Sequence, residues 1–339
     1  MIDRGRAARA FVYRGGVRLA GTVVACDAAA GSDLIFLSHA PASALGARGR
    51  RALPHLRSGS RQILATDVTL ALLGPAGDRM RRHALVAACG RPFSLGELRL
   101  ELYPSGFQPG AASLLCERGG RRLAYSGPVG AGPGVEVRAA DALCLDARGA
   151  AVASPPPAPE ALAAIGKAVR ALLADGRAPV VVASSPSVAL ETGRALAADR
   201  IALRGHRAVV QAAAAYRGAG LLAPPVTRFD RHLGGGEVLL WPAGERVPGQ
   251  RAGGRSLGVI EVGGPAGAPL AVPNAIALQF PERAGLTALV GYVEATGASE
   301  IAIVNAPDGE LMQALRGKGL DAYALGPPRQ ASLFEANAA

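Results

Sequence analysis

The stretch that decides the fold is SPPPAP at residues 154–159, followed by EALAAIGKAVRALLA at residues 160–174. A segment so rich in proline can form neither a helix interior nor an inner strand, so it marks a boundary in the chain. The residues after it repeat apolar side chains at helical spacing and predict an amphipathic helix. An apolar strand at Pro179–Ala183 and a second helix at Ser187–Ala198 follow. Together these segments predict a unit of alternating strands and helices.

The two sides of this boundary differ in pattern. Before it, short strand-like runs are joined by turns, and the apolar run Asp33–Leu37 has the length of a buried strand. Ser113–Glu117 and Arg121–Tyr125 flank Gly119-Gly120, a spacing typical of a β-hairpin. After the boundary, strands alternate with helices to the end of the chain. We therefore predict an α/β fold, divided into residues 1–152, 153–270 and 271–339.

Composition limits the class of protein. The chain has 339 residues, of which half are hydrophobic, enough for roughly two domains. No run approaches the roughly 20 apolar residues of a membrane span, and the polar start Met1–Arg4 is unlike a secretory signal. We therefore expect no membrane association and a cytoplasmic location. The four cysteines lie far apart and form no CxxC pair, which disfavours zinc ribbons and redox dithiols.

The charge of the chain indicates an anionic partner. Its 37 Lys and Arg outnumber 26 Asp and Glu, for a formal charge of +11. Residues 1–150 hold 20 basic and 11 acidic groups, whereas residues 271–339 hold 4 and 7, so the partner is expected on the earlier part of the chain.

Arginine clusters are the candidate nucleic-acid-binding residues, because guanidinium forks fit phosphate oxygens in pairs. A solvated arginine-rich surface produced by compositional bias is the alternative for any one cluster. Aromatic residues make up only 4% of the chain, which disfavours an extended platform for stacking bases. The candidates are Arg48, Arg50 and Arg51; Arg79, Arg81 and Arg82; Arg118, Arg121 and Arg122; and Arg204 and Arg207, on either side of His206.

The order of several segments resembles a known family. The segments are Asp33–Leu37 with Ser38-His39-Ala40, Pro104–Ala112, Leu123–Pro128, Ala142–Ala147, Val304-Asn305-Ala306 and Gly319–Ala322. They are similar to the motifs of the metallo-β-lactamase fold with a β-CASP insertion. The nearest members are the RNA 3′-end-processing-like and DNA-ligase-associated exonucleases. The resemblance implies an αββα sandwich from residues 1–152 and 271–339, with residues 153–270 as the β-CASP-like insertion.

The same resemblance implies chemistry that this chain lacks the residues for. Members of the family use two zinc ions that share a hydroxide, and this hydroxide attacks phosphorus. The HxHxDH motif becomes HAPASA at residues 39–44, which keeps only its first His. Phe107, Pro128 and Asn305 stand where three further ligands are expected. Zinc takes about four N, O or S ligands, so His39 cannot hold a two-metal centre.

We therefore expect no catalytic residue, no metal and no cofactor, and we interpret His39, Asp146 and Asn305 as relics of a former site. His39 is expected to be hydrogen-bonded at a strand end, and Asp146 to cap a turn or pair with an Arg. The alternative is a rebuilt metal site that uses His39, Asp27, Asp33 and Asp146.

The functional expectation is a catalytically inactive β-CASP nuclease homologue, or pseudonuclease. It would bind nucleic acid or act as a structural partner of an active nuclease, helicase or ligase, in RNA processing or DNA repair. The alternative is an active metal-dependent phosphodiesterase or exonuclease with a rebuilt metal site.

Overall fold

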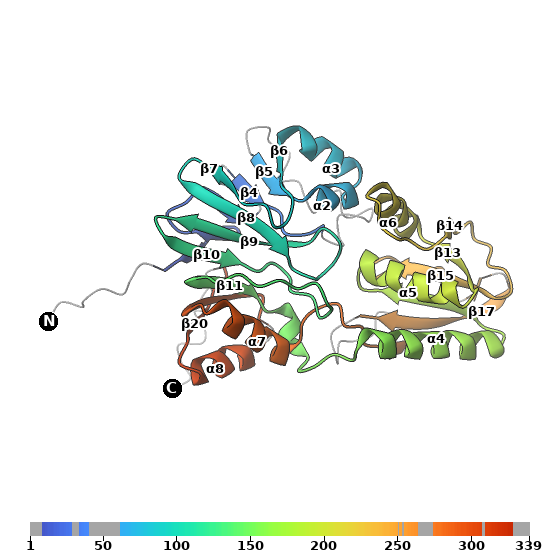
Figure 1. The fold of residues 1–339 in the computed structure, drawn as a ribbon. Helices are drawn as coiled ribbons and strands as arrows, with labels where there is room; N and C mark the ends of the chain where they lie inside the picture. The colour runs from blue at the N-terminus through green and yellow to red at the C-terminus, as the bar shows by residue number, and fades with distance from the viewer. Residues whose placement is uncertain are drawn as a thin grey trace, which may run out of the picture.

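A computed structural model describes most of the chain and shows a mixed α/β fold with three sheets (Figure 1). The described residues are 9–28, 34–40, 62–249, 251–252, 254–263, 274–306 and 309–327. Arg48, Arg50, Arg51 and Asp33 lie outside these ranges. Within them, no helix is long and apolar enough to cross a membrane.

The first sheet has six strands in chain order, antiparallel from β1 to β3 and parallel from β3 to β6. The strands are β1 (Phe11–Tyr13), β2 (Val17–Leu19), β3 (Val24–Cys26), β4 (Leu34–Phe36), β5 (Gln62–Ala65) and β6 (Ala84–Val86). Helices α2 (Asp67–Leu72) and α3 (Pro75–Met80) connect β5 to β6. Thr66 caps α2, and its hydroxyl accepts from the Thr69 amide at 3.1 Å.

The second sheet has seven strands in the order β20-β19-β11-β10-β9-β8-β7. The strands are β7 (Phe93–Leu95), β8 (Leu98–Pro104), β9 (Ala112–Arg118), β10 (Arg121–Tyr125), β11 (Ala142–Asp146), β19 (Glu300–Val304) and β20 (Asp321–Ala324). The predicted hairpin around Gly119-Gly120 is confirmed as β9 and β10. Strands β10, β11, β19 and β20 run parallel, so the end of the chain extends a sheet that its first part began.

Both faces of the second sheet are buried at its centre, which explains why residues 142–145 of β11 and 301–304 of β19 are all apolar. Ala142 and Cys144 of β11 face an apolar core shared with the first sheet. Leu143 and Leu145 point the other way, into a core shared with α7 (Leu286–Thr296) and α8 (Glu310–Gly317). The order of layers in this part is therefore helices, sheet, sheet, helices (Figure 1).

The third sheet lies beside the first two and has the order β14-β13-β15-β12-β17-β16, with β18 also paired to β17. Its strands are β12 (Ala178–Ala183), β13 (Ala202–Gly205), β14 (Val226–Arg228), β15 (Glu237–Pro242), β16 (Arg251–Ala252), β17 (Arg255–Val262) and β18 (Ile276–Leu278). Its helices are α4 (Ala158–Ala174), α5 (Pro186–Ala198) and α6 (Arg207–Gly218). Because β18 pairs with β17, the third sheet extends past the boundary expected at residue 270.

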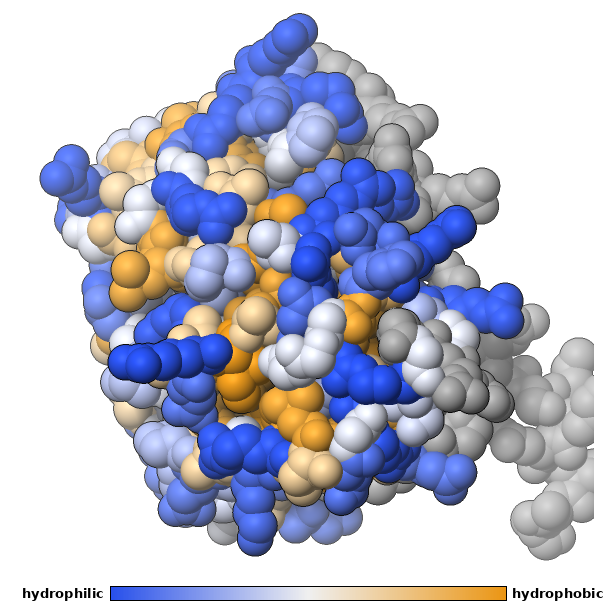
Figure 2. All heavy atoms as spheres, turned by 90° about the vertical axis from the view of Figure 1, so that its right-hand side faces the viewer, coloured by the Kyte–Doolittle hydropathy of each residue, from blue (hydrophilic) through white to orange (hydrophobic). Residues whose placement is uncertain are grey.

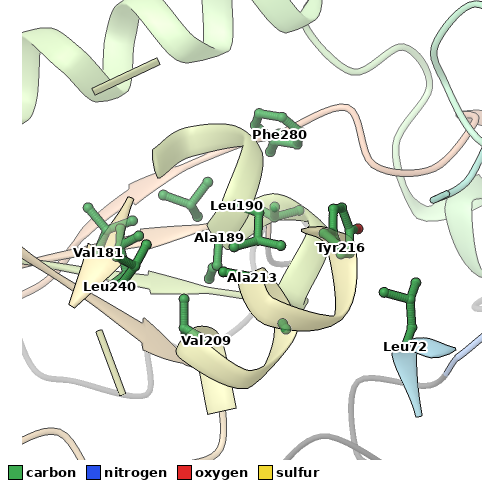
Figure 3. Close-up of a cluster of buried hydrophobic side chains, with 14 of the residues drawn as sticks. Leu72, Val181, Ala189, Leu190, Val209, Ala213, Tyr216, Leu240 and Phe280 are labelled. Atoms are coloured by element: carbon green, nitrogen blue, oxygen red, sulfur yellow. The ribbon is translucent and has the colours of Figure 1, made fainter. Parts of the chain in front are cut away.

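One apolar cluster joins the third sheet to the first. Figure 3 shows Leu190 of α5 and Tyr216 of α6 packed on the third sheet, with Leu72 of α2 at the side of the same cluster. The contact between α2 and α6 holds the two parts of the molecule together. The far end of the third-sheet part, seen in Figure 2, carries a hydrophobic patch within a hydrophilic border.

Candidate functional site

Four chain segments that are distant in sequence meet at one edge of the second sheet. Strands β8, β10, β11 and β19 all end there, because β10, β11 and β19 are parallel and β8 points the same way through two antiparallel pairings. The edge therefore gathers Phe107, Ser126, Asp146 and Asn305, and the loop with His39 lies against it. The three relic positions named by the resemblance thus lie at one site.

Asp27 organises the loop that carries His39. Its carboxylate accepts from the Ser38 amide at 2.9 Å, from the Ser38 hydroxyl at 2.5 Å and from the Tyr125 hydroxyl at 2.9 Å. The Ser38 hydroxyl also lies 2.9 Å from Nδ1 of His39. Since Ser38 gives its only proton to Asp27, Nδ1 of His39 must be the donor in that second bond. The His39 proton is thereby placed on Nδ1, and Nε2 keeps a lone pair.

His39 is held in its neutral form. Burial lowers its pKa, and the positive charges of Arg283 and Arg148 lower it further, while Asp27 opposes them. The ring of Phe107 stands edge-on to the imidazole, with the two ring centres 5.5 Å apart. The prediction of a hydrogen-bonded His at a strand end is confirmed.

Asp146 is saturated with protein partners. Its side chain is 1% exposed, and Nη2 of Arg148 lies 2.8 Å from Oδ2. The Arg148 amide donates to Oδ1 at 3.1 Å, and Nδ2 of Asn305 approaches Oδ2 at 3.3 Å. Asp146 therefore both caps a turn and pairs with an Arg, as expected, and its oxygens are occupied by N–H groups.

Arg283 is the residue of this site that sequence reasoning missed. It follows β18, and its guanidinium carbon lies 4.3 Å from the centre of the Phe107 ring. Within the described ranges it makes no hydrogen bond and no ion pair. Burial lowers the pKa of Arg283, and the negative charge of Asp146 opposes this shift more strongly than the positive charge of Arg148 adds to it. The neighbouring Glu282 instead accepts from Ser184 and Ser187 at the start of α5.

The donor atoms present do not fit two zinc ions. Asp27 and Asp146 are each committed to several hydrogen bonds, and Phe107 offers no donor atom. His39 supplies the one imidazole nitrogen at this site, against the roughly four ligands that each zinc needs. In the part of the chain that the structure covers, no three His, Cys, Asp or Glu side chains gather as metal ligands do.

The predicted arginines that the structure describes are not among the residues gathered at this edge. Arg118, Arg121 and Arg122 lie on the β9–β10 hairpin, at the opposite end of β10 from Tyr125. Four candidates are bound to carboxylates: Arg81 to Asp67, Arg118 to Glu97, Arg121 to Glu300 and Arg204 to Glu237. Four others make no ion pair with any described residue: Arg79, Arg82, Arg122 and Arg207.

Comparison with known proteins shows similarity of fold and nothing more. No family model matches the chain, and no curated protein matches it. The structure is similar to the crystal structure of a protein of unknown function from Enterococcus faecalis V583, with a TM-score of 0.57 and 12% sequence identity. The match covers 87% of this chain and 79% of that one. At this identity the similarity concerns the fold alone.

Proposed function

We propose that this chain is a pseudonuclease of the metallo-β-lactamase/β-CASP type, which binds nucleic acid without cutting it. In this proposal the first two sheets with their helices are the αββα sandwich, and the third-sheet part is the β-CASP-like insertion. The chain would act beside an active nuclease, helicase or ligase in RNA processing or DNA repair. The observation that carries the proposal is the saturation of Asp146 by Arg148 and Asn305, at the position where a nuclease needs a free carboxylate.

The same site argues against hydrolysis by other means. The Ser38 hydroxyl is fully buried and donates to Asp27, so it is not available as a nucleophile. In a serine hydrolase the His lies between Ser and Asp, whereas here Ser38 lies between Asp27 and His39. The arrangement orients His39 and does not activate the hydroxyl.

Binding of nucleic acid is supported by charge and not by aromatic stacking. Residues 1–150 carry an excess of basic groups, and Arg79, Arg82 and Arg207 make no ion pair with described residues. Arginines of this kind contact phosphates and add affinity without reading sequence. We expect weak sequence preference and strong dependence on salt.

The test is a pair of measurements on purified full-length protein. The first is hydrolysis of RNA and DNA oligonucleotides with added Zn²⁺ or Mn²⁺, for which we expect no product above a protein-free blank. The second is oligonucleotide binding by fluorescence anisotropy across a salt series, for which we expect affinity to fall steeply as salt rises.

Two results would count against the proposal. Metal-stimulated hydrolysis that disappears in His39→Ala would favour the alternative, a metal-dependent phosphodiesterase with a rebuilt site. Absence of salt-sensitive binding to any oligonucleotide would favour a structural partner role without nucleic acid contact.

A further inference from the structure

We propose that Arg283 and Arg148 form a binding site for one phosphate group at the edge where β10, β11 and β19 end. The inference rests on the proposed function, because the phosphate would belong to bound nucleic acid. The ligand class is a phosphate ester, held by charge and hydrogen bonds and not cleaved.

The first argument is the missing partner of Arg283. A guanidinium group carries five N–H donors, and a partly buried one normally bonds to a carboxylate or a carbonyl. Among the residues described, Arg283 has only the face of Phe107. The nearest carboxylate in sequence, Glu282, is held by Ser184 and Ser187. The in-plane N–H groups of Arg283 therefore have no protein acceptor among the described residues, and they are open to an oxoanion from solvent.

The second argument is the orientation that Phe107 imposes. The Phe107 ring is 8% exposed and covers one face of the guanidinium plane at 4.3 Å. A cation stacked on a ring keeps its N–H groups pointing outward from the rim of the plane. The imidazole of His39 packs perpendicular to the same ring, with the two ring centres 5.5 Å apart. Phe107 thus holds Arg283 with its donors directed away from the apolar contact.

The third argument is the local balance of charge. Arg148 turns Nε and Nη2 toward Asp146, and its side chain remains 49% exposed. Asp146 thus neutralises Arg148, Asp27 is bound to Ser38 and Tyr125, and His39 is neutral. Arg283 is thus the guanidinium of this site to which no carboxylate of the described residues is bonded. A phosphate beside Arg283 would supply that partner, and its oxygens match the paired N–H groups of a guanidinium.

The direct test uses inorganic phosphate as the probe and full-length protein. Isothermal titration calorimetry with phosphate should detect a site in the wild type, and Arg283→Gln should weaken it by at least about tenfold. Arg283→Lys keeps the charge but not the fork, so it should bind phosphate with intermediate affinity. Arg99→Gln, at an exposed residue of β8 without an ion pair to described residues, is the matched control and should bind like the wild type.

A second measurement separates this inference from the proposed function. Oligonucleotide anisotropy on the same variants should show weaker binding for Arg283→Gln than for Arg99→Gln. Suppose that the wild type binds oligonucleotides, and that Arg283→Gln binds both oligonucleotides and phosphate as well as the wild type does. In that case the phosphate site is wrong and the proposed function stands. If phosphate binding requires Arg283 but no oligonucleotide binds, the site stands and the proposed function is wrong.

Thermal melting of each variant, followed by circular dichroism, shows whether a loss of phosphate binding is caused by unfolding. A loss of phosphate binding in Arg283→Gln with an unchanged melting temperature supports the site. Retained phosphate binding in Arg283→Gln overturns it, whatever its melting temperature.

Discussion

The two ends of the second sheet carry arginines in opposite settings. At the hairpin end, Arg118 and Arg121 are about half exposed and paired with Glu97 and Glu300. At the other end, Arg283 is partly buried against Phe107 and has no carboxylate partner among the described residues. The hairpin end has three arginines, of which only Arg122 makes no ion pair with a described residue. The difference teaches that an anion site is better predicted from the carboxylate partners that each arginine has or lacks than from the number of arginines.

The largest expected effect is on the free energy of unfolding, which should fall much more when a buried ion pair is broken than when a surface ion pair is broken. Asp146→Ala removes a carboxylate that is 1% exposed and bonded to Arg148 and Asn305, so we expect the free energy of unfolding to fall by about 3 kcal/mol. Glu97→Ala removes a carboxylate that is 82% exposed, so the loss should be about 0.5 kcal/mol or less. Urea unfolding of both variants measures the contrast. Equal losses would mean that Asp146 is no more tightly held than a surface group.

A smaller effect on the free energy of unfolding is expected when Arg283 or Arg121 is replaced by methionine, and its sign should differ between the two ends of the sheet. Without ligand, Arg283→Met should leave stability unchanged or raise it by about 1 kcal/mol, because it removes a partly buried charge that lacks a partner. Arg121→Met should lower stability by about 0.5 kcal/mol, because it breaks the pair with Glu300. Thermal melting without phosphate measures both, and a clear loss in Arg283→Met would show that Arg283 has a structural role.

Added phosphate should raise the melting temperature only of those variants that keep Arg283. Ligand that binds only the folded state raises the melting temperature in proportion to the logarithm of its concentration above Kd. The wild type and Arg121→Met should both gain stability from phosphate, and Arg283→Met should not. An equal gain in all three would place the phosphate elsewhere on the molecule.

The smallest expected effect is a dependence of stability on pH. Burial and the neighbouring Arg283 and Arg148 lower the pKa of His39 below its ordinary 6.5. Between that lowered value and 6.5 the unfolded chain binds more protons than the folded one, so stability falls as pH drops through this window and is fully present above it. His206 also has a lowered pKa, chiefly through burial, so the wild type alone would not isolate His39.

The measurement is therefore a difference between two proteins. The loss of unfolding free energy between pH 7.5 and pH 5 should be smaller in His39→Gln than in the wild type. The NMR titration of His39 should have its midpoint below pH 6.5. Identical pH profiles, or a midpoint above 6.5, would show that His39 is not held neutral.

Much of the local structure followed from the sequence. The helix at residues 160–174 and the strand at Pro179–Ala183 correspond to α4 and β12, because both patterns arise from burial of one helix face or of a whole strand. The hairpin around Gly119-Gly120 was equally clear, since glycine permits the turn conformation there. These features depend on neighbours in the chain.

Other elements were not predicted. Helix α6 has the alanine-rich sequence RAVVQAAAAYRG, in which the apolar face is hard to recognise. Which face is buried is evident only from its packing on the third sheet and on α2. The position of β18 beside β17 moved the boundary of the third-sheet part past residue 270. A short strand can pair with either of two sheets, and only the surrounding packing decides which.

The candidate site was also predictable only in part from the sequence. The family resemblance predicted that His39, Asp146 and Asn305 belong to one site, and the structure places Asn305 against Asp146 and Asp146 near His39. Only the tertiary structure placed Arg283 on Phe107 and Arg148 on Asp146. Residue Arg283 comes from a segment of negative net charge, and 176 positions separate it from Phe107 in the numbering. A contact across that distance depends on how the sheets pack, and no local pattern encodes it.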